Sequence, residues 1–213
     1  MRTVKLAVTS AALVGLVSPL AFADPVQPVV VSSVPTTKTP WILDGTVNAV
    51  VEVGAITLAG GTFTQASTVN GTPVAANKLL AFDSAGALLP GFDAGLDGDV
   101  YALAPGPTDG TVYVGGQFTN AGGIVTRRVA LLDAATGRAI AGFKSAGFDG
   151  IVKDFERVGN RLIVGGTFAT AGGAPHAGLA TINATTGALD PYLNVQLTEH
   201  HNNSGSGAQA PVG

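Results

Sequence analysis

The sequence predicts an all-β fold made of three similar units, each with four short antiparallel strands. The motif Gly-Gly-x-Phe begins at Gly60, Gly115 and Gly165, so its spacings are 55 and 50 residues. The apolar runs around it are short, and Gly, Asn, Asp or Pro residues bound them, as they bound strands. Repeats of this length are typical of the blades of a β-propeller. We therefore expect a partial β-propeller of three four-stranded antiparallel blades, preceded by a signal peptide.

The first 23 residues have the three parts of a secretory signal peptide. Arg2 and Lys5 supply positive charge, residues 6–17 an apolar segment, and residues 21–23, Ala-Phe-Ala, a cleavage site between small residues. As a helix the apolar segment would reach only about 18 Å, which is shorter than the membrane core of about 30 Å. We therefore expect cleavage after Ala23 and a secreted or cell-surface protein with no transmembrane anchor in the mature chain. An uncleaved anchor is the alternative.

The rest of the chain divides into a linker, three blades and a tail. Residues 24–40 are rich in Pro, Val and Thr, which favours an extended linker. We expect the blades to span about residues 41–93, 94–144 and 145–196. In each blade two β-rich runs precede the Gly-Gly pair and two follow it, and an Asp-Gly pair opens the first run. Residues 197–213 are a polar tail or the start of a truncated fourth blade.

The composition excludes several classes of function. Without Arg2 and Lys5 the Lys and Arg count falls from 11 to 9 against 14 Asp and Glu, so the net charge moves from −3 to −5. This acidic balance argues against a nucleic-acid partner, which would need a clustered basic face. The chain has no cysteine, which excludes disulfides, thiolate metal sites and cysteine nucleophiles. Apolar burial and backbone ladders must therefore stabilise the exported domain.

Three residues stand at equivalent positions before a glycine turn: Asp83, Asp133 and Asn183. As general acids or bases they would form a catalytic set, but asparagine cannot act as a base. All three can form an Asx-turn, in which the short side chain accepts a backbone N–H and stabilises the reversal. We therefore expect a structural role for them and predict no catalytic residues in this chain.

A carboxylate cluster is predicted in the connection between the first two blades. Asp93, Asp97 and Asp99 are the calcium candidates, because calcium takes several oxygen ligands from such loops. Their spacing differs from that of a calcium-binding helix–loop–helix, and the next connection has Lys144 instead. No other cofactor is expected.

The binding candidates are two arginines and all the histidines of the chain. His176 lies in a loop between the second and third strands, and His200 and His201 lie in the tail; in a propeller such loops and blade connections emerge on one face. A solvated loop is the alternative for the histidines, because adjacent histidines on an extended segment point opposite ways. Arg127 and Arg128 lie on the same face and suit carboxylate or sugar-acid recognition. Their alternative role is gatekeeping charge at the start of an apolar strand.

The second unit carries a resemblance to a known family. Residues 99–104 read Asp-Val-Tyr-Ala-Leu-Ala, residues 108–119 contain Thr-Asp-Gly and Val-Gly-Gly-Gln-Phe-Thr, and residues 128–133 read Arg-Val-Ala-Leu-Leu-Asp. In this pattern the chain resembles the secreted bacterial delta-60-type β-propeller repeat family, over about residues 41–196. The resemblance implies a propeller outside the cell and no particular reaction. Residues 132–138 are also similar to the blade motif of quinoprotein propellers, which place a tryptophan where this chain has Phe143.

Two functions from different classes fit these observations. The first is an exported, non-enzymatic scaffold or binding module for a carbohydrate, peptide or cell-wall partner, as part of a longer propeller. The alternative is part of a secreted propeller enzyme, a quinoprotein-like oxidoreductase or a glycan-active enzyme, with catalytic residues outside this chain. In either case a propeller of three blades leaves two sheet faces without a neighbour. We therefore also expect self-association through these open faces.

Overall fold

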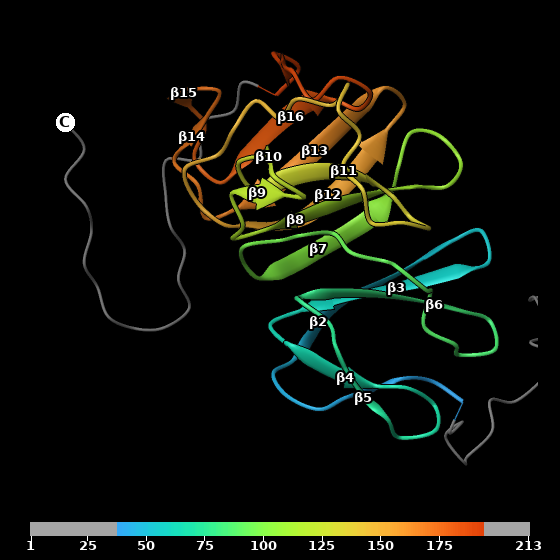
Figure 1. The fold of residues 1–213 in the computed structure, drawn as a ribbon. Helices are drawn as coiled ribbons and strands as arrows, with labels where there is room; N and C mark the ends of the chain where they lie inside the picture. Colours follow the sequence, from blue (N-terminus) through green and yellow to red (C-terminus); the bar gives the residue numbers. More distant parts are fainter. Residues whose placement is uncertain (1–37, 194–213) are drawn as a thin grey trace, which may run out of the picture. The chain divides into compact units, whose positions relative to one another are not determined.

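The computed structural model describes residues 38–193, and every regular element in this range is a β-strand (Figure 1). The all-β prediction is confirmed. The expected signal peptide of residues 1–23, most of the linker of residues 24–40 and the tail of residues 197–213 lie outside the described residues. Residues 38–193 contain no helix that is long and apolar enough to cross a membrane.

Three antiparallel sheets follow one another along the chain, and each expected blade contributes one of them (Figure 1). The strands of the first sheet are β2 (Val47–Val53), β3 (Ile56–Gly61) and β6 (Leu79–Asp83); those of the second are β7 (Val100–Pro105), β8 (Thr111–Gly116) and β11 (Val129–Asp133); those of the third are β12 (Val152–Val158), β13 (Arg161–Gly166), β16 (Leu179–Asn183) and β17 (Leu189–Asp190). Within each sheet, the strands lie side by side in the order in which they occur along the chain.

The prediction of four strands in every unit holds only for the third sheet. In the first and second sheets the fourth run pairs through single bridges, Phe82 with Leu88 and Leu132 with Ala139. The physical reason is an early turn. In the first unit the N–H of Phe92 donates to the carbonyl of Leu89 (3.3 Å), and in the second the N–H of Phe143 donates to the carbonyl of Ile140 (3.0 Å), so the chain turns away directly after the bridge. The outer edge of the first sheet is therefore largely unpaired by described residues.

Three small hairpins follow the second strands, where the sequence predicted only loops. They are β4 (Gln65–Ser67) with β5 (Pro73–Ala75), β9 (Asn120–Ala121) with β10 (Ile124–Val125), and β14 (Thr170–Ala171) with β15 (Ala174–Pro175). In the first unit β1 (Trp41–Ile42) pairs with β4 as well. The second and third hairpins turn on Gly-Gly pairs with positive φ, such as Gly122 (55°) and Gly123 (81°). Consecutive positive φ values suit the turns that join two-residue hairpins.

The sheets pack face to face, and their first strands adjoin, because β7 lies beside both β2 and β12. One apolar cluster between the first and second sheets contains Leu58, Val100 and Val114. Another, between the second and third sheets, contains Ala102 and Val164. Val100, Ala102 and Val114 of the second sheet are accordingly buried, at 0%, 4% and 0% exposed.

The second glycine of each Gly-Gly pair lies against the backbone of the preceding connection. A Cβ built on Gly116 would be 2.0 Å from the carbonyl oxygen of Asp99. The corresponding glycines of the other two pairs would meet carbonyl oxygens at 1.8 and 2.1 Å. The register of β7 against β8 shifts by one residue beside this point, between Val100 and Ala102. The repeated glycine therefore provides the space that this bulge requires.

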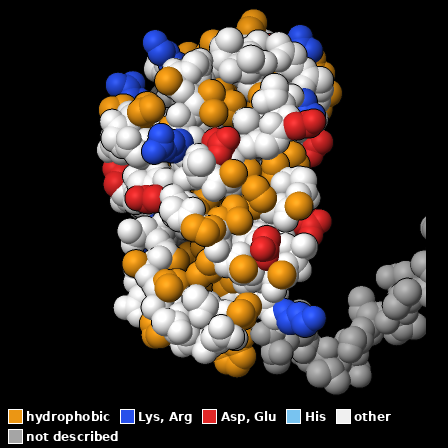
Figure 2. Space-filling view, turned by 45° about the vertical axis from the view of Figure 1, so that its right-hand side comes forward, with side chains coloured by type: hydrophobic (Ala, Val, Ile, Leu, Met, Phe, Trp, Pro, Cys, Tyr) orange, Lys and Arg blue, Asp and Glu red, His pale blue; other side chains and the backbone are white. Residues whose placement is uncertain are grey.

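Hydrophobic side chains also reach the surface. In the view of Figure 2 they gather in a hollow along the middle of the face, and charged side chains stand around them. Among the large hydrophobic residues, Val50 is 61% and Val125 is 65% exposed. Exposed apolar surface of this kind marks sites of association or ligand binding when it is continuous.

Candidate functional site

The Asp-Gly pair that opens each unit holds the following hairpin in place, and Asp97 shows how. Its Oδ1 accepts the backbone N–H groups of Thr119 (2.7 Å) and Asn120 (2.9 Å). Its Oδ2 accepts the Thr119 hydroxyl (2.6 Å) and the side-chain amide of Asn120 (2.7 Å). Burial raises the pKa of Asp97, but the hydrogen bonds from Thr119 and Asn120 outweigh it and hold the pKa below its ordinary value. Asp97 is therefore an anchor for β9.

The other two units repeat this anchor. Asp44 accepts the N–H groups of Thr64 and Gln65, both at 2.8 Å, and Asp149 accepts those of the two corresponding residues, both at 2.9 Å. The hydrogen bond from the Thr64 hydroxyl is the main reason that the pKa of Asp44 lies below its ordinary value. All three hairpins are thus held at the same end of their sheets. We call residues 62–78, 117–128 and 167–178 the hairpin face.

The Asx-turns that the sequence predicts are confirmed. In Asp83, Asp133 and Asn183 a side-chain oxygen accepts the backbone N–H of the residue two positions further on, at 2.9, 3.1 and 3.0 Å. Asparagine forms the same turn as aspartate because only an acceptor oxygen is needed.

The side chain of Arg128 contacts the backbone at the start of its own hairpin. Its guanidinium donates to the carbonyl of Gln117. Lys78, at the equivalent position of the first unit, donates to the carbonyl of Thr62 (2.8 Å) and lies 3.0 Å from Asp99 Oδ1. Both residues have positive φ, 84° and 65°. Arg128 is therefore engaged in holding its hairpin, and its expected role in ligand binding stays a prediction.

Arg127 and His176 belong to the hairpin face, at the ends of the second and third hairpins. Arg127 is exposed, with φ of 47°, and its Cδ lies 3.0 Å from the position of a Cβ on Gly147. His176 is only 8% exposed and takes the place of the buried Thr126 of the second hairpin. His200 and His201 lie outside the described residues, so the expectation that they emerge on the same face as His176 stays a prediction.

The calcium candidates Asp93, Asp97 and Asp99 stay a prediction, and the structure shows what each side chain contacts. Asp97 accepts the four hydrogen bonds described above, Asp93 Oδ1 accepts the N–H of Gly95 (2.8 Å), and Asp99 pairs with Lys78. Within residues 38–193 no group of three or more His, Cys, Asp or Glu side chains could hold a metal ion. The three carboxylates are close in sequence, but each is turned to a different partner.

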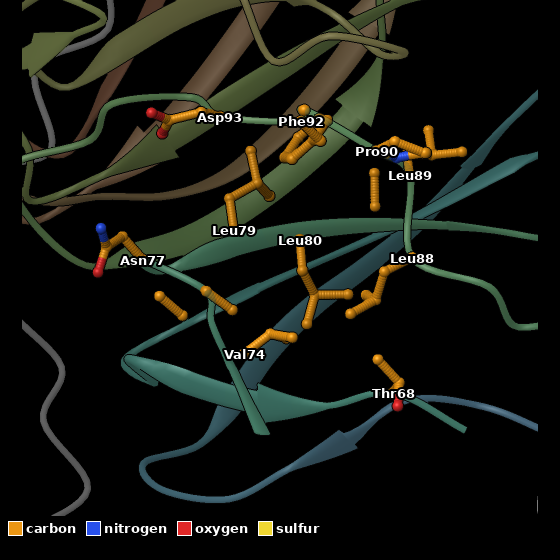
Figure 3. A pocket seen from close by; sticks show the side chains of 14 residues that line it. Thr68, Val74, Asn77, Leu79, Leu80, Leu88, Leu89, Pro90, Phe92 and Asp93 are labelled. Atoms are coloured by element: carbon orange, nitrogen blue, oxygen red, sulfur yellow. The ribbon is translucent and has the colours of Figure 1, made fainter. Parts of the chain in front are cut away.

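A cavity of about 570 Å³ lies beside β6, between the first hairpin and the connection to β7 (Figure 3). Sequence reasoning missed it. Leu79 and Leu80 project from β6 in opposite directions in Figure 3. The apolar lining comes mainly from Val74, Leu79, Leu80, Leu88, Leu89 and Phe92. Three of the polar lining residues are Thr68, Asn77 and Asp93, and Figure 3 places Asn77 and Asp93 toward the same end.

The free edge of β6 adjoins this cavity. The carbonyl of Lys78 accepts the N–H of Gly61 in β3, whereas the carbonyl of Ala81 faces outward and accepts the N–H of Leu89 (2.9 Å). Because backbone groups alternate along a strand, the polar groups of Leu79 also face outward. No backbone hydrogen bond from a described residue joins the outward-facing groups of Leu79 or the N–H of Ala81. The cavity thus combines apolar walls with unpaired strand edge.

The chain was compared with known proteins to identify its family. No curated protein sequence matches the chain. Among solved structures, the crystal structure of the computationally designed Ika4 protein is 17% identical and covers 68% of this chain and 70% of its own, with a TM-score of 0.45. The designed Ika8 protein is 12% identical and covers 68% of this chain and 48% of its own, with a TM-score of 0.35.

A family model described as the Rax2 C-terminal beta propeller domain matches residues 81–206, which is more than half of the chain. The match supports a β-propeller family, while the finer resemblance to the delta-60-type repeat stays a prediction. The described part of the match contains the second and third sheets and begins within β6. With its repeated antiparallel sheets, the chain belongs to the Rax2 C-terminal β-propeller domain family.

Proposed function

We propose that this propeller is an exported, non-enzymatic binding module that takes an extended peptide segment of an extracellular or cell-wall partner into the cavity beside β6. The observation that carries the proposal is the unpaired edge of β6 next to apolar walls. An extended peptide that adds to such an edge gains main-chain hydrogen bonds, and a pocket for its alternate side chains supplies specificity.

The dimensions and chemistry of the cavity support a peptide ligand. Its volume of about 570 Å³ lies within the range of small-ligand sites, about 300–1,000 Å³. Leu80 and Leu88 offer apolar surface for a large aliphatic or aromatic side chain. Asn77 and Asp93 at one end are exposed and polar. The carboxylate of Asp93 there favours a peptide with a Lys, an Arg or a free amino group at that end.

The polar residues that recur in the units have structural roles, so the cavity is a better candidate for ligand binding than the turns. Asp97 and its counterparts hold the hairpins, Asp83 and its counterparts hold the glycine turns, and Lys78 and Arg128 hold backbone carbonyls. The Asp and Asn residues recur because every unit must make the same turns, and the cationic residue recurs in two of the three units. The cavity is bordered instead by a feature peculiar to the first unit, its long first hairpin.

Export is the other part of the proposal, and it rests on residues 1–23. The charged start, the apolar segment and the Ala-Phe-Ala site favour secretion, and a chain without cysteine needs no disulfide formation on the way. N-terminal sequencing of protein recovered from the medium should give Asp24 as the first residue. Material that begins at Met1 and stays in the cytoplasm would contradict export.

The peptide site can be tested by panning a display library of random decapeptides against the full chain. We expect selected peptides to carry a large apolar residue and to lose affinity, by roughly tenfold or more, for the variant Ala75→Trp. Ala75 is exposed and lines the cavity, so the indole blocks its mouth without removing core contacts. Val125→Trp is the matched control, because Val125 ends the second hairpin as Ala75 ends the first.

Equal binding of the peptides to both variants would place their site elsewhere. Failure to select any peptide, together with binding on a glycan array that Ala75→Trp abolishes, would overturn the peptide ligand in favour of a carbohydrate.

A further inference from the structure

The two internal junctions between sheets use the same contact. A Cβ built on Gly60 of the first sheet would be 2.4 Å from Val100 Cγ1 and 3.4 Å from Leu103 Cδ1. The first glycine of the second pair, Gly115, likewise faces β12. A Cβ there would be 2.7 Å from Val152 Cγ1 and 2.6 Å from Phe155 Cζ. In both junctions a glycine of the second strand thus receives two apolar side chains from the first strand of the next sheet.

The third sheet has the same glycine without these neighbours. A Cβ built on Gly165 would meet described atoms of Asp154 alone, at 3.9 Å or more. Gly60 and Gly115 are buried, whereas Gly165 is partly exposed. We call the side of the third sheet that carries Gly165 and Asp154 the trailing face. Its glycine leaves the space that a neighbouring first strand would fill.

The first sheet has the complementary side chains. Val47 and Val50 stand at the positions of Val100 and Leu103 in the second unit. They are 42% and 61% exposed, whereas Val100 is fully buried. We call the side of the first sheet that carries Val47 and Val50 the leading face. Two positions whose apolar side chains pack against a glycine in both internal junctions are therefore exposed at this end.

We propose that two copies of this chain associate head to tail, with Val47 and Val50 of one copy seated on Gly165 of the other. A second copy is the occupant that fits, because the chain itself carries both halves of a contact that it already makes twice. A contact between unlike faces builds a ring when its rotation closes and a filament when it does not. The inference is independent of the proposed peptide site.

Charges on the trailing face make this junction weaker than the internal ones. Asp154 and Glu156 replace Ala102 and Ala104, and both are exposed. On the leading face Glu52 lies two residues beyond Val50. Bringing these carboxylates together costs desolvation and like-charge repulsion. The association is therefore expected to be reversible and to depend on concentration, whereas the internal junctions are permanent.

The test is the oligomeric state of the full chain, measured by sedimentation velocity over a range of concentrations. The wild type should show a dimer or a head-to-tail series that dissociates on dilution. Gly165→Val should be monomeric with an unchanged melting temperature, because its Cβ would make only ordinary contact with Asp154, at 3.9 Å or more. Gly115→Val, by contrast, should melt earlier, because a Cβ there meets Phe155 and Val152.

Further variants make the result independent of any one substitution. Val50→Ser should weaken the association by roughly tenfold, and Val125→Ser, an equally exposed valine on a hairpin, should leave it unchanged. Replacing Asp154 and Glu156 by alanine should strengthen it by roughly tenfold. The proposal would be overturned if the chain stayed monomeric at every concentration, or if neither Gly165→Val nor Val50→Ser changed its self-association.

Disulfide trapping tests the geometry directly, since the chain has no cysteine of its own. A mixture of the Val50→Cys and Gly165→Cys variants should form a covalent dimer under mild oxidation. The mixture of Val125→Cys and Gly165→Cys should not. A covalent dimer of equal yield in both mixtures would contradict the head-to-tail contact.

Discussion

The hydroxyl of Tyr113, in the second sheet, donates a hydrogen bond to the backbone carbonyl of Ala184, in the third unit. Both residues are fully buried, and the ring of Tyr113 also lies against Phe143 and Phe155. The contact joins residues 71 positions apart in the chain. It therefore links β8 of the second sheet to the turn that follows β16 of the third sheet.

Replacing Tyr113 with phenylalanine should destabilise the chain by about 1–2 kcal/mol, because the buried carbonyl of Ala184 loses its donor while the ring contacts remain. Urea unfolding measures the change, and Tyr101→Phe, at a partly exposed tyrosine, is the control. Burial raises the pKa of Tyr113 to about 12. The contribution of the Tyr113 hydroxyl to stability should therefore be complete below about pH 10. It should be lost as the pH rises from there through the folded pKa of about 12. A phenylalanine variant with the same alkaline unfolding curve as the wild type would contradict this role.

Valine in place of Gly116 should lower the free energy of unfolding by about 1–3 kcal/mol. A Cβ at this position would stand 2.0 Å from the carbonyl oxygen of Asp99, so the bulge beside it must move. Thermal unfolding of Gly116→Val can be compared with that of Gly165→Ala, where the added methyl has room. An unchanged melting curve for Gly116→Val would show that the repeated glycine is incidental.

Asparagine in place of Asp97 should loosen the second hairpin and change the response to acid. Hydrogen bonds hold the folded pKa of Asp97 below the ordinary carboxyl value of about 3.9. Its contribution to stability is therefore complete above that pH and is lost as the pH falls through the folded pKa. We expect the wild type to lose more stability than Asp97→Asn between about pH 4 and pH 2, as measured by urea midpoints. Asp109→Asn, at an exposed turn, should follow the wild-type curve.

Valine in place of Thr181 should stabilise the chain, by about 1 kcal/mol. The Thr181 hydroxyl is buried and has no hydrogen-bond partner among the described residues. The equivalent positions of the other two sheets are the apolar Ala81 and Leu131. A valine of the same shape removes the unpaired oxygen and keeps the packing. A lower melting temperature for Thr181→Val would mean that the hydroxyl does have a partner in solution.

The sequence predicted the long strands well because the Gly-Gly motif aligned the units. Once Gly60, Gly115 and Gly165 were superposed, the runs before and after them fell on the observed second and third strands. The Asx-turns were predictable for a related reason: asparagine at Asn183 shows that the position needs only an acceptor oxygen. A turn that recurs three times can be predicted from a single sequence, because the residues at its three copies show which property the position requires.

The hairpins and the short fourth strands were harder to predict. Strands of two or three residues carry too little pattern for a period of two to be visible. The Gly122-Gly123 and Gly172-Gly173 pairs were the available signal, since adjacent glycines favour a hairpin turn.

The candidate site could not be predicted because it depends on features of one unit alone. Asp93, Asp97 and Asp99 looked like a cluster along the chain, but their side chains have separate partners in space. The cavity beside β6 arises where the first hairpin, the strand and the connection to β7 enclose a volume, which no linear spacing reveals. The exposure of Val50 similarly depends on which sheet has a neighbour.

Backbone amide exchange at Leu79 and Ala81, followed by NMR, tests the central claim most directly, because these groups form the unpaired edge of β6. On addition of a peptide selected from the decapeptide library, their exchange should slow by about tenfold or more, while the amides of the corresponding edge residues Val129 and Leu131 should not change. Slowing at both edges, or no change at Leu79 and Ala81 when the peptide is bound, would contradict strand addition at this site.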